Sequence, residues 1–103
     1  MAMNLKAVTT IFGYQQITSL SSAQGLAVPA VTPNGGGLNA KPSFALIVAE
    51  GQAVRWRDDG AAPTASVGMP LAVGVPLQYD GDLNRIKFIE QTGGAKLNIS
   101  YYS

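Results

Sequence analysis

Short segments that alternate apolar and polar residues, separated by glycine and proline, constrain this chain more than any other feature. The chain has 12 glycines and 6 prolines in 103 residues, and no long window repeats apolar residues at helical spacing. Runs such as "QAVRWRD" and "AKLNISYYS" alternate instead, as half-buried strands do. The sequence therefore predicts about six to eight short strands joined by turns.

The segment "SFALIVAEG", residues 43–51, predicts the central strand of a sheet. Both of its faces are apolar, with Phe44, Leu46 and Val48 on one and Ala45, Ile47 and Ala49 on the other. Strands with two apolar faces are usually covered on both sides. The following "AEGQ" predicts a hairpin to the next strand, because Gly51 tolerates a positive φ.

Further strand signals complete an all-β prediction. Pro70 and Pro76 cannot donate a hydrogen bond to a neighbouring strand, so their segment should lie at an edge or be broken. Residues 95–102 give the clearest half-buried strand, and "TTIFGYQQITSL" should contain another. We expect a single-domain antiparallel β-sandwich or jelly roll with an extended, low-charge N-terminal segment.

Charge divides the chain into two parts. Residues 1–40 contain one charged residue, Lys6, and residues 41–103 contain the other twelve. We predict that residues 1–40 form an N-terminal arm or strands that pack on neighbouring subunits, and that residues 41–103 form a compact β-domain. Charged residues are 13% of the chain, about half the usual share, and 47% are hydrophobic. This composition favours a surface covered by a partner.

The composition excludes several kinds of chemistry. Without cysteine or histidine, the chain has no thiol nucleophile, no Ser-His-Asp triad and no histidine-ligated metal site. A net charge of +1 leaves no electrostatic footprint for nucleic acid or an anionic membrane. The start lacks a signal peptide, and no apolar run is long enough to span a bilayer. We predict a soluble, non-enzymatic protein, intracellular when made, without catalytic residues, cofactor or metal.

Two acidic clusters, Asp58-Asp59-Gly60 and Asp80-Gly81-Asp82, offer an alternative to this prediction. Clustered carboxylates bind calcium, and paired carboxylates cleave glycosides. Neither cluster has the D-x-D-x-D-G spacing of a calcium loop, however. Aspartate and glycine also favour tight turns, and we prefer that interpretation for both clusters.

The stretch "AVRWRDDGAAPT", residues 53–64, places the only tryptophan between two arginines. Strand alternation predicts that Val54 and Trp56 face the core and that both arginines face away. The arginines would then pair with nearby acids or with a partner subunit, whereas the alternative is a surface that stacks on a sugar or base. At the C-terminus, alternation puts one of two tyrosines outward. The candidate interface residues are Arg55, Arg57, Asp58, Asp59 and Tyr102.

The runs "EGQAVRWRDDGAAPTASVGMPLAVG" and "LNRIKFIEQTGGAKLNISYY" resemble short virion-associated proteins of tailed double-stranded-DNA bacteriophages. The resemblance covers about residues 43–103, and its most specific mark is "RWRDDG-x-x-PT-x-x-x-G-x-P-L". It implies a structural virion protein, foremost a capsid decoration or cement protein that stabilises the head. A neck or tail component, or a surface carbohydrate- or receptor-binding module, is the alternative. The resemblance carries over no catalytic residue.

The same resemblance implies partners and a location. The partners would be the major capsid protein or other virion proteins, and the protein would form a homo-oligomer. A trimer is favoured because decoration proteins sit at symmetry axes of the capsid. We expect no direct contact with nucleic acid or membrane. The protein would be made in the host cytoplasm and end in the virion, on the capsid surface.

Overall fold

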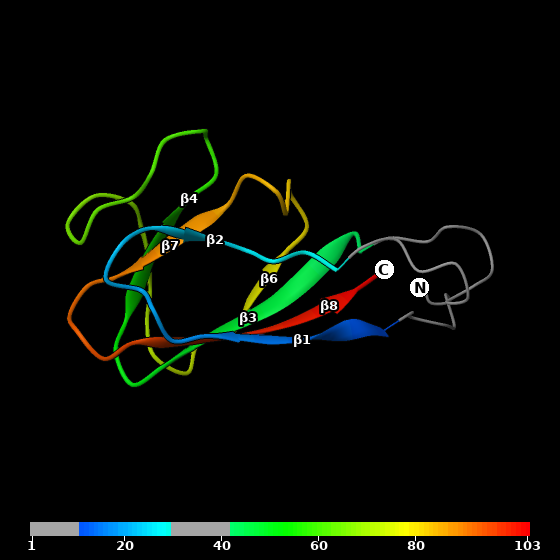
Figure 1. The fold of residues 1–103 in the computed structure, drawn as a ribbon, viewed down its shortest axis with the longest axis horizontal. Coiled ribbons are helices and arrows are strands. Elements are labelled where there is room, and N and C mark those ends of the chain that lie inside the picture. Colours follow the sequence, from blue (N-terminus) through cyan, green and yellow to red (C-terminus); the bar gives the residue numbers. More distant parts are fainter. Residues whose placement is uncertain (1–10, 30–41) are drawn as a thin grey trace.

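The chain folds into strands in both parts of the sequence that the structure, a computed structural model, describes: residues 11–29 and 42–103 (Figure 1). Within these residues there are eight strands and no helix, so the all-β prediction is confirmed. None of the described residues belongs to a helix that could cross a membrane. The strands are β1 (Ile11–Ile17), β2 (Gln24–Gly25), β3 (Phe44–Glu50), β4 (Val54–Arg57), β5 (Met69–Leu71), β6 (Leu77–Tyr79), β7 (Lys87–Glu90) and β8 (Lys96–Tyr102).

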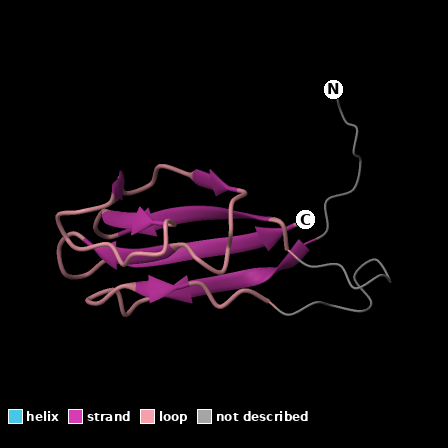
Figure 2. Ribbon diagram, turned by 90° about the horizontal axis from the view of Figure 1, so that it is seen from above, coloured by secondary structure: helices cyan, strands magenta, loops and turns pink. Residues whose placement is uncertain are grey.

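The strands form two four-stranded antiparallel sheets. The first sheet has the order β1-β8-β3-β6, and the second has the order β2-β7-β4-β5. Seen from above, the strands lie in layers along the long axis of the molecule (Figure 2). Inward side chains of both sheets join one buried cluster, which gives the predicted sandwich.

The two N-terminal strands belong to the sandwich. Strand β1 pairs with β8 over most of its length, and the two-residue β2 pairs with β7. Residues 11–29, the described part of the predicted N-terminal segment, thus supply one strand to each sheet. Residues 1–10 and 30–41 lie outside the described residues. Packing of residues 1–40 on neighbouring subunits stays a prediction.

The core is built from alternate residues of the paired strands. Cross-strand partners such as Ala45 and Tyr101, or Ile47 and Ile99, are at most 1% exposed. Removing such apolar surface from water is the main favourable term in folding. The buried side chains are Leu20, Ala45, Ile47, Ala49, Val54, Leu71, Tyr79, Leu83, Ile86, Phe88, Ala95, Leu97, Ile99 and Tyr101. The predicted alternation of residues 95–101 is thus confirmed.

Strand β3 is central in its sheet, as predicted, but it is covered on one side only. The inward residues Ala45, Ile47 and Ala49 are buried, whereas Leu46 on the other face is 38% exposed. Phe44 and Val48 on that face are half-buried. The prediction of cover on both sides is therefore wrong for the described chain. The reason is that the second sheet packs against the inner face alone.

The connection after β3 is not a hairpin. Strand β3 pairs with β8 and β6 in the first sheet, and β4 pairs with β5 and β7 in the second. Long-range pairing therefore replaces the predicted local pairing, and the turn carries the chain from one sheet to the other. Gly51 has a φ of 84°, and a Cβ there would lie 2.7 Å from the Gly94 carbonyl oxygen. Only glycine fits this turn without strain.

The edges of both sheets are short or interrupted. Strand β5 is an edge strand with Pro70 at its centre, and the three-residue β6 forms an edge of the first sheet. The expectation from the prolines is thus confirmed. At the other edge of the first sheet, the register of β1 shifts between Ile11 and Gly13, which marks a bulge.

Candidate functional site

Four of the five candidate interface residues lie together at the end of β4 and in the loop that follows it. In this strand Val54 is fully buried and Trp56 is half-buried against the core. The indole ring meets the ring of Tyr79 edge to face, with 5.9 Å between the centroids. Val54 and Trp56 thus point toward the core, as predicted from strand alternation.

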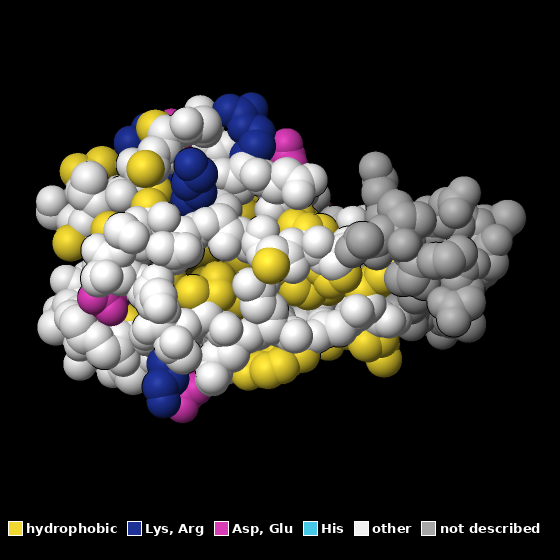
Figure 3. Space-filling model, in the orientation of Figure 1, with side chains coloured by type: hydrophobic (Ala, Val, Ile, Leu, Met, Phe, Trp, Pro, Cys, Tyr) yellow, Lys and Arg dark blue, Asp and Glu magenta, His cyan; other side chains and the backbone are white. Residues whose placement is uncertain are grey.

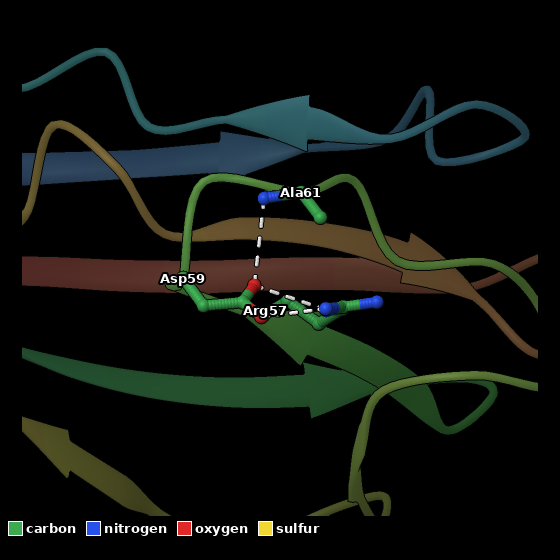
Figure 4. Close-up of polar contacts among 3 residues, drawn as sticks. All are labelled: Arg57, Asp59 and Ala61. Atoms are coloured by element: carbon green, nitrogen blue, oxygen red, sulfur yellow. Dashed lines mark hydrogen bonds and ion pairs between the residues drawn. The ribbon is translucent and has the colours of Figure 1, made fainter.

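Arg57 pairs with Asp59 across one intervening residue. Its Nε donates to Oδ1 at 3.0 Å and its Nη2 donates to Oδ2 at 2.5 Å, a bidentate arrangement. The Ala61 N–H also donates to Oδ1 at 3.4 Å (Figure 4). The hydrogen bonds from Arg57 are the main cause that lowers the pKa of Asp59 to about 2. The same contact raises the pKa of Arg57.

Arg55 binds the loop that leads into β5. Its Nε donates to the Ala65 carbonyl oxygen at 3.1 Å, and its Nη1 donates to the Gly68 carbonyl oxygen at 2.9 Å. The two arginines therefore have partners within their own chain. Arg57 meets its own aspartate, and Arg55 fixes the backbone of residues 65–68.

Asp58 connects this region to the first sheet. The Tyr79 hydroxyl donates to Asp58 Oδ2 at 2.7 Å. Burial, followed by this contact with a carboxylate, raises the pKa of Tyr79 to about 12. Because Asp58 follows β4 and Tyr79 ends β6, the hydrogen bond joins the two sheets at one edge of the sandwich.

Three of the candidate residues, Arg57, Asp58 and Asp59, border a groove of about 410 Å³. Its lining consists of Trp56, Arg57, Asp58, Asp59, Val67, Gly68 and Met69. The volume falls in the usual range for small-molecule sites. An apolar floor beside a carboxylate and an ion pair suits a ring-shaped or apolar group that also carries hydroxyls.

The acidic clusters take part in turns. Asp59 accepts from the Ala61 N–H, and Asp82 accepts from the Asn84 N–H at 3.0 Å, each two residues ahead. This is the side-chain-to-backbone pattern of aspartate turns, which supports our preferred interpretation of both clusters. Among residues 11–29 and 42–103, no group of three or more acidic side chains gathers in a way that could hold a metal ion.

Tyr102, the fifth candidate, lies elsewhere. It ends β8 in the first sheet and stacks on Phe44 of β3, with 5.4 Å between ring centroids. Four candidates therefore share one site and the fifth belongs to another surface. A role of these five residues in an interface stays a prediction.

A hydrogen-bonded network that no sequence pattern indicated lies on the outward side of the first sheet. Asn98 Oδ1 accepts from the Tyr14 hydroxyl at 2.5 Å and from Gln16 Nε2 at 2.9 Å. Asn98 Nδ2 donates to Glu50 Oε1 at 3.0 Å. The contacts join β1, β8 and β3, and their register cannot be read from any one strand. The available signal was the second apolar row of β3, which we interpreted as buried.

Comparisons with protein-family models, with curated proteins and with solved structures give no match to this chain.

Proposed function

We propose that the protein is a non-enzymatic structural subunit of a bacteriophage particle, foremost a capsid decoration or cement protein. The observation that carries the proposal is the apolar surface left uncovered on a small domain. Tyr14 is 64% exposed on β1 and Met69 is 56% exposed on β5. Hydrophobic side chains gather at the surface beside β4 and along β1 (Figure 3). Exposed apolar surface of this kind supports a role in assembly.

The mechanism is binding to the assembled state. A subunit that bridges neighbouring capsid proteins buries surface that only the intact shell presents. Its binding free energy therefore adds to the stability of the shell by mass action. Within the chain, the Arg57–Asp59 pair and the Arg55 contacts tie the loop beside β4 to the strand and restrict its conformations. Such order lowers the entropy cost of binding.

Adding the protein back to stripped capsids tests this proposal. We expect the purified chain to bind expanded heads and to raise the temperature at which they release DNA. An unrelated all-β protein of similar size serves as the control. If the chain leaves the heat and low-salt stability of the heads unchanged, the cement proposal is wrong. Imaging of whole particles then distinguishes a neck or tail position from one on the head.

The groove beside Trp56 favours a second candidate, a surface module that binds carbohydrate. Half-buried Trp56 lines the groove next to Asp58, which offers an indole surface and a carboxylate to a sugar. Titration of the Trp56 fluorescence with host surface oligosaccharides tests it. A saturable change that Asp58→Asn weakens supports binding. An emission that no oligosaccharide alters contradicts it.

A further inference from the structure

Among the described residues, the side of the first sheet that faces away from the second sheet is uncovered and forms a continuous surface, which we call the outer face. Cross-strand partners in an antiparallel sheet point to the same side, so the register assigns its members. They are Ile11, Tyr14 and Gln16 of β1, Lys96, Asn98, Ser100 and Tyr102 of β8, Phe44, Leu46, Val48 and Glu50 of β3, and Gln78 of β6. Charge on this surface is confined to the end where Glu50 and Lys96 are cross-strand neighbours in the register.

We propose that the outer face binds the outer face of a second copy of this chain, about a two-fold axis that runs along the strands between β8 and β3. The inference rests on the proposed function, because it names one partner of an assembly subunit. It commits to a pairing of identical surfaces, which is the commonest symmetry of homo-oligomers. The contact would produce a dimer in place of the trimer that the resemblance favours.

The central polar group of the outer face, the Asn98 side chain, already has hydrogen-bond partners within the subunit, which lowers the cost of burying it. The Asn98 side chain makes three hydrogen bonds, to Tyr14, Gln16 and Glu50. Burial of an amide is costly mainly where it leaves donors or acceptors unpaired. This network removes that cost for Asn98 before a partner arrives. It also holds the Tyr14 ring, a large exposed apolar group, in place over the sheet.

The shape of the outer face suits a copy of itself. Leu46 borders two hollows, one of about 370 Å³ beside Phe44 and Tyr102 and one of about 200 Å³ beside Tyr14 and Val48. An exposed side chain between two hollows can enter a hollow of the facing surface. The two-fold axis gives the same contact twice, once from each copy.

Charge complementarity selects the direction of the axis. An axis along the strands, between β8 and β3, places each β8 residue over the copy of its own cross-strand partner. Lys96 then faces Glu50 of the second copy, and Tyr102 faces Phe44 of the second copy. A two-fold axis across the strands would instead place the charged end of one copy on the aromatic end of the other. Both charges would then be buried without a partner of opposite sign. Both axes keep the strands of the two sheets within the usual limit of about 30° of alignment, so charge is what distinguishes them.

Charge-reversal variants test the contact between two copies, because a change of contacts within one subunit would not be repaired by mixing the variants. Glu50→Lys makes both charged positions of the pair positive, and Lys96→Glu makes both negative. We expect each variant alone to dimerise about tenfold or more weakly than the wild-type chain, because like charges then face each other. In an equimolar mixture of the two variants, every facing pair is opposite in sign. The mixture should form heterodimers, detected by sedimentation equilibrium.

A second pair of variants tests the centre of the outer face. Leu46→Lys inserts a charge there, and we expect the dimer dissociation constant to rise about 30-fold or more. Met69→Lys is the matched control, since it changes an exposed apolar residue of the second sheet and should leave the dimer intact. Both side chains are exposed, so melting temperatures near that of the wild type confirm that the variants fold.

Three results would overturn the inference: a monomeric or trimeric wild-type chain, a mixture no tighter than either charge variant alone, or equal effects of Leu46→Lys and Met69→Lys. A monomer in which only Leu46→Lys abolishes binding to heads would identify a capsid protein as the occupant. That result keeps the proposed function and rejects the second copy. Conversely, a dimer through this face that does not protect heads keeps the inference and rejects the cement role.

Discussion

The two faces of strand β3 have similar chemistry and opposite surroundings. Ala45, Ile47 and Ala49 point into the sandwich and are at most 1% exposed. Phe44, Leu46 and Val48 point outward, although they are on average the larger side chains. The inner row can be small because Tyr101 and Phe88 fill much of the core. Apolar character alone therefore does not decide which row of a strand is buried within the subunit.

The difference also bears on what the outward row contributes to the free energies of folding and of association. Within the subunit it leaves apolar surface in water, which contributes nothing to folding. If the outward row is covered by a partner, its burial contributes to the free energy of association. We therefore expect the inner row to control the free energy of unfolding, and the outer row to control association.

The largest expected effect comes from truncating the inner row. Ile47→Ala removes a fully buried side chain and should lower the free energy of unfolding by about 2–5 kcal/mol. Leu46→Ala, its neighbour on the outer face, should cost less than about 1 kcal/mol in dilute subunits. Urea unfolding at low protein concentration measures both. Similar losses for the two variants would mean that the outer row already packs within the subunit.

The next effect concerns the turn at Gly51, which carries the chain from the first sheet to the second. Gly51→Ala meets a positive φ and a backbone oxygen 2.7 Å from the new Cβ. Gly74→Ala is the matched control, with a φ of 78° and no atom within 4 Å of the Cβ. We expect about 1 kcal/mol lost at Gly74 and about 1–2 kcal/mol more at Gly51. Equal losses in thermal or urea unfolding would show that the Gly94 carbonyl moves freely.

A smaller effect separates adjacent tyrosines on the two faces of β8. Tyr101 is buried, and burial raises its pKa to about 12. In the unfolded chain a tyrosine titrates near 10, so the folded state holds the proton more tightly. This contribution to stability is complete below about pH 10 and is lost as the pH rises to about 12.

Tyr101→Phe removes this contribution, so its melting temperature should fall less steeply between pH 10 and 12 than that of the wild type. Some of the fall should remain, since burial also raises the pKa of Tyr79 to about 12. Tyr102→Phe changes the outward neighbour and is the control that keeps Tyr101. An unchanged pH profile in Tyr101→Phe would contradict the assignment.

The smallest expected effect belongs to the exposed Arg57–Asp59 pair. The pKa of Asp59 is lowered to about 2, so its contribution is present above about pH 4 and is lost as the pH falls toward 2. Asp59→Asn should lower the melting temperature slightly at pH 7, and the difference should vanish near pH 2. Asp80→Asn is the control for removing one carboxylate. A difference that persists at pH 2 would point to a role of Asp59 other than this pair.

Local patterns predicted the fold well. The alternation of residues 95–102 and the prolines of the β5 segment each reflect a constraint within one strand, and both predictions hold. The hairpin at Gly51 failed because the choice between pairing β4 with β3 or with β7 depends on the whole arrangement. The cover over Leu46 failed because an apolar row looks the same whether its partner lies in the chain or outside it.

The candidate site was predicted in part. Adjacent sequence positions brought Arg55, Arg57, Asp58 and Asp59 into one region, as expected from their spacing. The partners of Arg55 and Asp58 could not be foreseen, because they are backbone carbonyls of a later loop and a tyrosine of the other sheet. The network around Asn98 depends on the register of three strands and has no signature in any one of them.

The interrupted edges of the two sheets have a consequence for growth. A flat, open edge strand recruits further strands and can seed fibres of unlimited length. Here Pro70 breaks the donor pattern of β5, β6 offers only three residues, and the bulge near Gly13 disturbs β1. Strand addition is thus discouraged in the direction in which aggregates elongate. The faces of the sheets then remain as surfaces through which a second copy could bind, and a two-fold contact between faces closes after two subunits.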